Sequence, residues 1–284
     1  MSHCCLVYLD STISGLLERV SAIAASLVHQ KDLKLNGLKL NKEKSKLEPM
    51  KVGGGGGLGF LIDTIKMQFW VPPKKIALLK SNLNFIISSR SVTFRDLPRV
   101  AGFINLLFLA VGPIAKLFTR QIHFTIQAWS GRDCSFPISG PLLEELHFWF
   151  LNIEAFNGYG IQLKFSPGAV IFCDASVLTF GGFQVRFNNQ PVSGMFSPFD
   201  SKQSSTFREA HVVLLRHKRV KVFSGNQNTC RIVLFGSPKQ HLQSLAIDVF
   251  WLCLENGIQI HAQWIPSKAN FKADALSHFL DKND

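Results

Sequence analysis

The segment after residue 167 constrains the fold most, because its predicted elements come in a restrictive order. Residues 169–173, 181–187 and 191–196 are rich in apolar and β-prone residues and are bounded by Gly, Pro or Asn, which predicts three strands. Helix and strand patterns then alternate toward the C-terminus. A meander of antiparallel strands followed by alternating elements favours a mixed sheet with helices packed on it. We therefore predict an α+β domain over residues 168–284.

The middle of the chain, residues 72–157, is predicted to be helical. Residues that open or cap helices stand at positions 72–73, 93, 112–113 and 140–141. The most apolar run, residues 100–111, contains Asn105 and is too short to span a bilayer, so we expect a buried helix there. Gly, Pro and Ser cluster between residues 157 and 167 and mark the boundary before the sheet domain.

The N-terminal segment begins with a strand pattern followed by a helix pattern. An apolar run ends at Leu9, and Asp10-Ser11-Thr12 then predicts a turn and a helix cap. Apolar residues follow at positions 16, 20, 23 and 27, which is helical spacing. We predict an amphipathic helix that reaches Gln30 and whose apolar face belongs to the core.

Five consecutive glycines, residues 53–57, come next and predict a flexible loop, because they carry no side chain that can pack. A phosphate-binding loop is not indicated, since no Lys-Ser or Lys-Thr pair follows them. Residues 58–62 and 67–71 then predict two short strands, joined through Asp63-Thr64 as a hairpin.

Charge favours a polyanionic partner. The chain has 31 Lys and Arg against 19 Asp and Glu, a formal net charge of +12. A field of this sign favours nucleic acid, and a basic surface that binds nothing is the alternative. Six Cys residues lack metal or disulfide spacing and no secretory signal is visible. We therefore expect no membrane association and an intracellular location, in the cytoplasm or the nucleus.

Three acids stand where sheet and helix ends would bring carboxylates together. Asp174 closes the strand Ile171-Phe172-Cys173-Asp174, where an Asp also serves simply to form a turn. Glu209 lies one turn into a predicted helix, and Asp274 lies at the start of the terminal helix. Helix N-termini favour negative charge without any ligand, so each acid alone is weak support for a site.

Taken in order, however, these segments resemble a known family. Residues 204–209, residues 220–233, Trp264-Ile265-Pro266 and residues 270–277 resemble the ribonuclease-H-like domain of DIRS-type retrotransposon polyproteins. Upstream, Tyr8-Leu9-Asp10-Ser11 resembles the Tyr-x-Asp-Asp hairpin of reverse transcriptases, and Lys44-Ser45, Leu58-Gly59-Phe60, Met67 and Pro72 resemble the stretch that follows it.

The resemblance implies a division of the whole chain. Residues 1–71 would be the end of a reverse-transcriptase palm, residues 72–157 a helical thumb or connection, and residues 168–284 a ribonuclease-H-like mixed sheet with flanking helices. Fingers and most of the palm are then expected to lie outside this chain.

The resemblance also implies a metal-dependent site. In the family, carboxylates matching Asp174, Glu209 and Asp274 are catalytic and hold two Mg²⁺ ions roughly 3.5–4 Å apart while the RNA strand of an RNA–DNA hybrid is hydrolysed. Oxygen ligands suit such hard cations. This chain departs from the pattern at Gly225, where the family has another acid, and in the three-residue link 216–218, which is shorter than the family's. We expect impaired hydrolysis.

The polymerase resemblance is weaker. Ser11 stands where the hairpin's second acid belongs, which leaves Asp10 as a degenerate polymerase site. We expect no reverse-transcriptase activity.

Basic and aromatic side chains are further candidates for nucleic-acid binding. Arg216, Lys218, Arg219 and Lys221 either follow a phosphate backbone or form a solvated face. Trp264 and Phe271 either stack on bases or, as the favoured reading, pack at a strand end. The nine His residues form no HExxH or paired ligand spacing.

Three hypotheses therefore remain open. The first is a retroelement-derived enzyme fragment in which Asp174, Glu209 and Asp274 support slow, Mg²⁺-dependent hydrolysis. The second is a non-catalytic nucleic-acid-binding or domesticated interaction protein, and the third is a decayed copy without a function.

Overall fold

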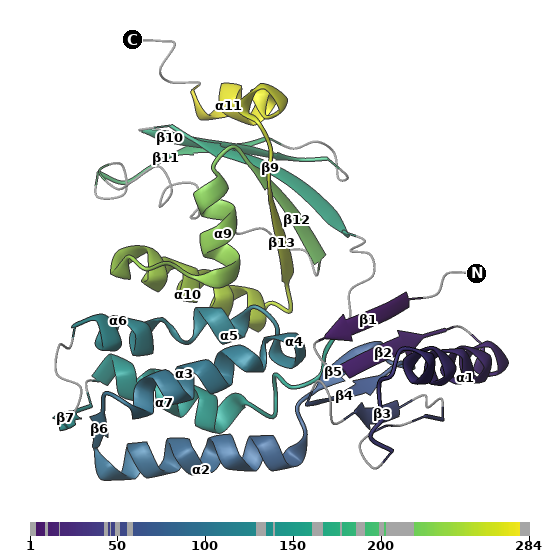
Figure 1. Ribbon diagram of the computed structural model, residues 1–284. Coiled ribbons are helices and arrows are strands. Elements are labelled where there is room, and N and C mark those ends of the chain that lie inside the picture. The colour runs from purple at the N-terminus through teal and green to yellow at the C-terminus, as the bar shows by residue number, and fades with distance from the viewer. Residues whose placement is uncertain are drawn as a thin grey trace. The chain divides into compact units, whose positions relative to one another are not determined.

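A computed structural model shows the architecture of the chain (Figure 1). It describes residues 4–8, 11–16, 18–42, 45, 47–48, 52–55, 59–128, 135–138, 140–160, 167–176, 178–185, 191–198, 202 and 219–278. The chain divides into two units. Unit 1 comprises residues 1–89, 109–112 and 146–162, and unit 2 comprises residues 90–108, 113–145 and 163–284. The three-segment division expected from the family resemblance remains a prediction.

Unit 1 begins with a hairpin and a helix. Strand β1 (Cys4–Tyr8) pairs in antiparallel fashion with β2 (Ser11–Gly15), and helix α1 follows (Arg19–Leu35). The predicted helix cap at residues 11–12 is therefore wrong, because these residues satisfy their backbone groups in a strand ladder. The apolar face of α1 is also not core: Val20 and Leu27 are 78% and 62% exposed. Helical spacing predicted the helix correctly but does not say what covers its apolar side.

A four-stranded sheet in the order β3-β4-β5-β8 follows in unit 1. Its strands are β3 (Val52–Gly55), β4 (Phe60–Asp63), β5 (Gln68–Trp70) and β8 (Tyr159–Gly160). The predicted hairpin is present, and the Asp63 carboxylate accepts the Ile65 and Lys66 N–H groups in its turn. The loop predicted for the glycine run is wrong for residues 53–55, because backbone hydrogen bonds to β4 need no side chain.

The predicted helical middle is present. Its helices are α2 (Pro73–Ser89), α3 (Asp96–Leu106), α4 (Phe108–Val111), α5 (Ile114–Leu117), α6 (Arg120–Ala128) and α7 (Gly140–Asn152). Two short strands, β6 (Ser91–Thr93) and β7 (Ser135–Pro137), pair beside them. None of the described helices is both long and apolar enough to cross a bilayer.

Two details of this helical region differ from the prediction. The helix expected over residues 100–111 is buried along one side, but it breaks at Leu107 into α3 and α4. Thr93 does not cap α3. It ends β6, and its N–H and hydroxyl donate to the Asp96 carboxylate at 3.2 and 2.6 Å. Asp96 therefore stabilises the entry to α3 from within the first turn, where negative charge is favoured.

The predicted mixed sheet forms the centre of unit 2. Its order is β11-β10-β9-β12-β13, with bounds β9 (Ala169–Ala175), β10 (Thr179–Gln184), β11 (Pro191–Met195), β12 (Arg219–Ser224) and β13 (Gln259–Trp264). The first three strands are antiparallel neighbours, and β12 lies parallel to both β9 and β13. The predicted mixed sheet is present, and the predicted α+β class is confirmed.

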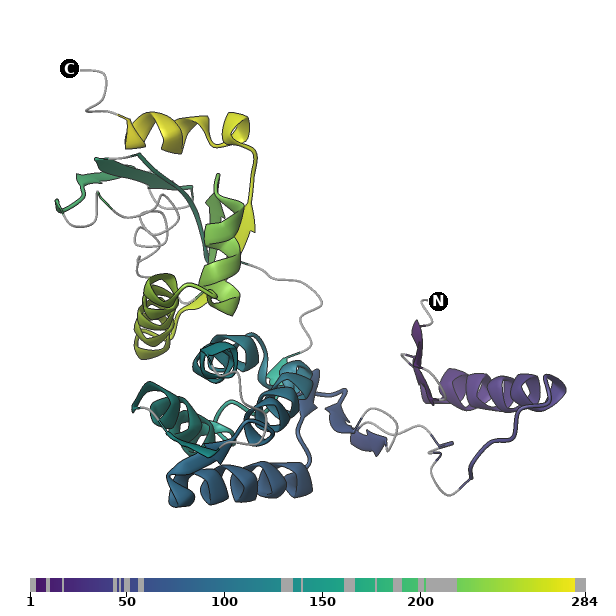
Figure 2. The same cartoon turned by 60° about the vertical axis from the view of Figure 1, so that its left-hand side comes forward.

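Helices cover both faces of this sheet (Figures 1 and 2). Helices α9 (Gln227–Phe235) and α10 (Gln240–Glu255) pack beside β12 and β13. The short 3₁₀ helix η2 (Ser267–Ala269) leads into α11 (Phe271–Ser277), which lies on β9 and β10 from the other face. One buried hydrophobic cluster lies on a single face of this sheet. It consists of Ile171 and Cys173 of β9 and Val220 and Val222 of β12.

Within unit 2, polar contacts join helices α5 and α6 to helices α9 and α10, which pack on the sheet. Gln243 of α10 is fully buried, donates to the Leu117 carbonyl at 2.8 Å, and accepts the Ser237 N–H at 2.9 Å. Arg120 donates to the Phe235 carbonyl at 3.1 Å. The Phe118 ring also packs edge-on against Phe250, with centroids 5.1 Å apart. These contacts make helices α5 and α6 part of the same unit as the sheet.

Glu145 is a buried acid of helix α7. Its carboxylate accepts the N–H groups of Gln121 and Ile122 at 3.0 and 2.9 Å, at the first turn of α6. Burial raises its pKa from 4.5 to about 7, although the backbone hydrogen bonds and the charge of Arg120 oppose that shift. Burial and the charge of Arg231 lower the pKa of Arg120. Burial and the charge of Arg120 lower the pKa of His123.

This raised pKa predicts a pH-dependent stability. Since folded Glu145 holds its proton more tightly than unfolded Glu145, stability should fall as pH rises from about 4.5 to about 7, and then level off. The total loss should be roughly 3 kcal/mol. Urea unfolding at several pH values should show this loss in the wild type and not in Glu145→Gln. Equal pH dependence in both proteins would contradict the assignment to Glu145.

Candidate active site

The site lies at one edge of the mixed sheet, where two parallel strands end. Asp174 is the sixth residue of β9, and Gly225 directly follows β12, whose last residue, Ser224, is paired with Cys173. A Cβ atom added at Gly225 would lie 3.6 Å from Asp174 Oδ1 and 3.7 Å from Ser267 Oγ. Residue 225 therefore borders the Asp174 carboxylate, and a side chain fits there at ordinary contact distance.

Helix α11 brings Asp274 to the same edge, where one of its carboxylate oxygens lies within 4.8 Å of a ligand atom of Asp174. The Ser277 hydroxyl donates to Asp174 Oδ2 at 2.8 Å, and the Ser277 carbonyl accepts the Thr179 hydroxyl. The approach is close because Gly181 lies beneath the helix: a Cβ there would overlap the backbone of Leu276 and Ser277. Gly181 of β10 is the cross-strand partner of Asp174 of β9. The close approach of α11 at Gly181 therefore also fixes the distance between α11 and the Asp174 carboxylate.

Asp174, Asp274 and His278 form a cluster of potential metal ligands. One ligand atom from each lies within 4.8 Å of the others. Burial is the main cause that raises the pKa of Asp174, and the nearby Asp274 raises it further, while the Ser277 hydrogen bond and His278 lower it. A divalent cation between these groups would offset the desolvation and repulsion of the two acids.

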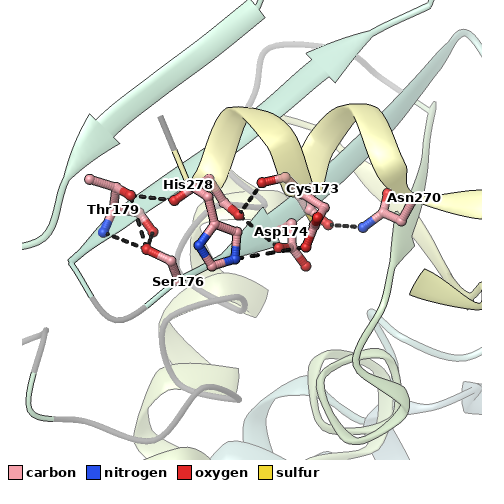
Figure 3. Close-up of polar contacts among 8 residues, drawn as sticks. Cys173, Asp174, Ser176, Thr179, Asn270 and His278 are labelled. Carbon is pink, nitrogen blue, oxygen red and sulfur yellow. Dashed lines mark hydrogen bonds and ion pairs between the residues drawn. The ribbon is translucent and has the colours of Figure 1, made fainter. Parts of the chain in front are cut away.

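Asn270 is part of this edge and was not among the predicted site residues. It is 2% exposed, and its Nδ2 donates to the Cys173 carbonyl at 3.0 Å (Figure 3). Its Oδ1 is buried and has no hydrogen-bond partner among the described residues. A buried amide oxygen in that state is a potential ligand for an ion or a water. The residues present thus fit a divalent metal, with Asp174, Asp274 and His278 as its holders.

The other predicted site residues are not brought to this edge by the described part of the chain. Asp10, Glu209, Arg216 and Lys218 lie outside the described residues. Arg219 is exposed at the first residue of β12, at the opposite end of that strand from Gly225. Lys221 lies on the face of the sheet that carries Asp174, with its Nζ 4.9 Å from the centre of the Phe223 ring.

Aromatic side chains line this face. The rings of Phe172 and Phe183 stack at 4.9 Å, and those of Phe172 and Phe223 at 4.8 Å. Lys272 of α11 lies with its Nζ 4.5 Å from the centre of the Phe183 ring.

The predicted packing at a strand end is wrong for Trp264 and Phe271, which are 46% and 71% exposed. Trp264 has a polar role instead, since its indole N–H donates to the Gly225 carbonyl at 2.9 Å.

The close approach at Gly181 predicts a stability effect. Gly181→Ala should lift α11 from the sheet and cost about 1–3 kcal/mol, the usual range for overpacking. Gly102→Ala is the matched control, because a Cβ at that helical position meets nothing within 4 Å and alanine favours a helix. Urea unfolding of both variants gives the comparison, and equal stabilities would contradict the close approach.

Comparisons with known proteins found matches among solved structures, all at low identity. No family model matches, and no curated protein matches. Among solved structures, the foamy viral protease–reverse transcriptase dRH in complex with double-stranded DNA matches with a TM-score of 0.44 and 15% identity, over 91% of this chain. This chain spans 46% of that protein.

Two smaller proteins match part of the chain. A ribonuclease H1 isolated from compost, in complex with an RNA/DNA hybrid, matches with a TM-score of 0.32 and 14% identity, over 38% of this chain and 92% of its own. Ribonuclease H1 from the halophilic archaeon Halobacterium salinarum matches with a TM-score of 0.30 and 14% identity, over 40% of this chain and 98% of its own.

Proposed function

We propose that the chain is a retroelement-derived reverse transcriptase and ribonuclease H fragment that binds RNA–DNA hybrid and hydrolyses its RNA strand weakly. One observation carries this proposal: the carboxylates of Asp174 and Asp274 lie close together at the carboxyl edge of a ribonuclease-H-like sheet, and residue 225 borders Asp174. The DIRS-type resemblance of the motifs around these acids supports the same assignment. It also supplies Glu209 as the third proposed ligand.

Divalent metal, Mg²⁺ in the family, would supply the activation of water and the stabilisation of the leaving oxygen. Asp174 and Asp274 would hold that metal, and Ser277 orients Asp174 through its hydroxyl. Asn270 fixes the start of α11 to the end of β9 through the Cys173 carbonyl. Hydrolysis is proposed to be weak because Gly225 offers no side-chain oxygen at the fourth position.

The basic surface predicts binding that depends on salt. Each phosphate contact releases counterions, so affinity for hybrid should fall steeply as salt rises and should not depend on sequence. Filter binding at several salt concentrations measures this. Lys221→Ala should weaken binding and reduce the salt slope by about 1, whereas Lys239→Ala, an exposed cation at the start of α10, is the control. Affinity that is independent of salt would contradict the electrostatic proposal.

The second proposed function is a non-catalytic nucleic-acid-binding or domesticated interaction protein, and the missing acid at residue 225 favours it. The two proposals differ in one property. The enzyme should lose residual hybrid cleavage in Asp174→Asn, whereas the binding protein should show no metal-dependent cleavage in either form. Equal hybrid binding by both forms, without cleavage, would favour the non-catalytic protein.

A further inference from the structure

Two large aromatic side chains, Trp264 and Phe271, are exposed on one short segment of unit 2. Trp264 is the last residue of β13, and Phe271 is the first residue of α11. A single exposed apolar residue is ordinary on a protein surface. Two rings that are 46% and 71% exposed within eight residues of each other instead offer a pair of apolar surfaces to a partner.

The indole of Trp264 is fixed in place. Its Nε1–H donates to the Gly225 carbonyl at 2.9 Å. The backbone continues this attachment, because the Ile265 N–H donates to the Ser224 carbonyl at 3.0 Å. A ring that is already held in one orientation loses little conformational entropy when a partner packs on it.

Phe271 is anchored close to the same glycine. It directly follows Asn270, which is buried and donates to the Cys173 carbonyl at 3.0 Å. The Asn270 Nδ2 atom lies 3.8 Å from the point where a Cβ of Gly225 would lie. Gly225 therefore adjoins the attachment points of both aromatic residues, and Trp264 and Phe271 belong to one surface at the carboxyl end of β12.

The charge of this segment suits a polyanion. Residues 256–273 contain no Asp or Glu, and Lys268 and Lys272 are exposed among the aromatic residues. Asp174 and Asp274 at the neighbouring edge repel phosphates, so a bound phosphate backbone is expected to follow the lysines. Exposed rings interleaved with cations are the combination that binds single-stranded nucleic acid, through base stacking and phosphate contacts.

We propose that Trp264 and Phe271 stack on unpaired bases of a single-stranded nucleic acid whose phosphates contact Lys268 and Lys272. Every base has an aromatic face, so this contact tolerates any sequence. The surface adjoins the proposed active site but requires neither its metal nor cleavage of hybrid. It therefore adds a second nucleic-acid contact, made to bases, to the electrostatic contact proposed for hybrid.

Two labelled probes of equal length and charge test the proposal on the full chain. One is a short oligodeoxythymidine, and the other is the same strand with abasic sites in place of the thymidines. Fluorescence anisotropy should show that the wild type binds the strand with bases more tightly. Phe271→Ala should lose about 5–150-fold in affinity for oligodeoxythymidine, the range for one stacked base, and should bind the abasic strand as the wild type does. Lys268→Ala should weaken binding of both strands equally.

Matched variants separate stacking from a loss of structure. Phe85→Ala removes an equally exposed ring, 71%, from α2 and should leave both affinities unchanged. Phe271→Trp should keep the preference for bases, because it keeps a ring that can stack. Trp264→Ala should reduce that preference while circular dichroism shows a folded protein.

Two results would overturn the proposal. One is equal binding of the two strands by the wild type, and the other is equal binding of oligodeoxythymidine by Phe271→Ala and Phe85→Ala. Self-association that Phe271→Ala removes, without any preference for bases, would also overturn it and assign the ring to a contact between copies of the chain. Neither probe contains hybrid, so failure of hybrid binding or cleavage would overturn the proposed function and leave this result standing.

Discussion

A Gly225→Asp variant is expected to cleave the RNA strand of a hybrid in Mg²⁺ at least about 10–100-fold faster than the wild type. That range is the effect of losing an outer partner of a metal site, and a direct ligand should contribute more. The new Cβ would lie 3.6 Å from Asp174 Oδ1, so the added carboxylate enters the site without displacing backbone. Cleavage of an end-labelled RNA strand measures the gain.

Two variants separate ligand restoration from other effects of the substitution. Gly225→Asn has nearly the same shape but no charge, and it should give little or no gain. Asp174→Asn added to Gly225→Asp should abolish the gain. If Gly225→Asp folds normally by circular dichroism and still does not cleave, the shortened link after Glu209 has displaced the site, and the enzymatic proposal fails.

Gln243→Ala is expected to cause the largest loss of stability among the variants considered for unit 2. Gln243 is fully buried, and its side chain satisfies the Leu117 carbonyl and the Ser237 N–H. Each buried group left without a partner costs about 1–3 kcal/mol, so the total loss should be roughly 2–6 kcal/mol. Gln240→Ala, exposed on the same helix, is the matched control and should change stability by less than about 0.5 kcal/mol.

Urea unfolding of the two variants gives the comparison. The Leu117 carbonyl belongs to α5, so Gln243→Ala should loosen the packing of α5 against α10 as well as α10 itself. Protease resistance of the link between α5 and α6 offers a local readout. Equal stability of Gln243→Ala and Gln240→Ala would show that the buried amide does not join the two parts.

Much of the sheet domain follows from local sequence patterns. The strand predicted over residues 169–173 is present within β9, and Asp274 lies in the first turn of α11, as predicted. The place of Gly225 at this site follows from the family resemblance, and the parallel pairing of β9 with β12 accounts for its proximity to Asp174. The strand and the helix depend on local patterns that a single sequence contains, whereas residue 225 was located by the order of the motifs.

Other features depend on contacts that the sequence does not reveal. Residues 11–15 form β2 because β1 pairs with them. Gly53–Gly55 form part of β3 because β4 pairs with them. The roles of Asn270 and His278 depend on how α11 lies over Gly181, a contact across nearly a hundred residues. The orphaned Asn270 oxygen has no sequence signature, although its position four residues before Asp274 places both on one side of the helix start.

The electron paramagnetic resonance spectrum of Mn²⁺ bound to the chain together with a hybrid shows directly whether the site is one carboxylate short. Two Mn²⁺ ions roughly 3.5–4 Å apart in a two-metal site are magnetically coupled, whereas a single ion is not. We expect an isolated Mn²⁺ signal from the wild type and a coupled pair from Gly225→Asp. A coupled pair already present in the wild type, or no bound Mn²⁺ in either protein, would contradict this account.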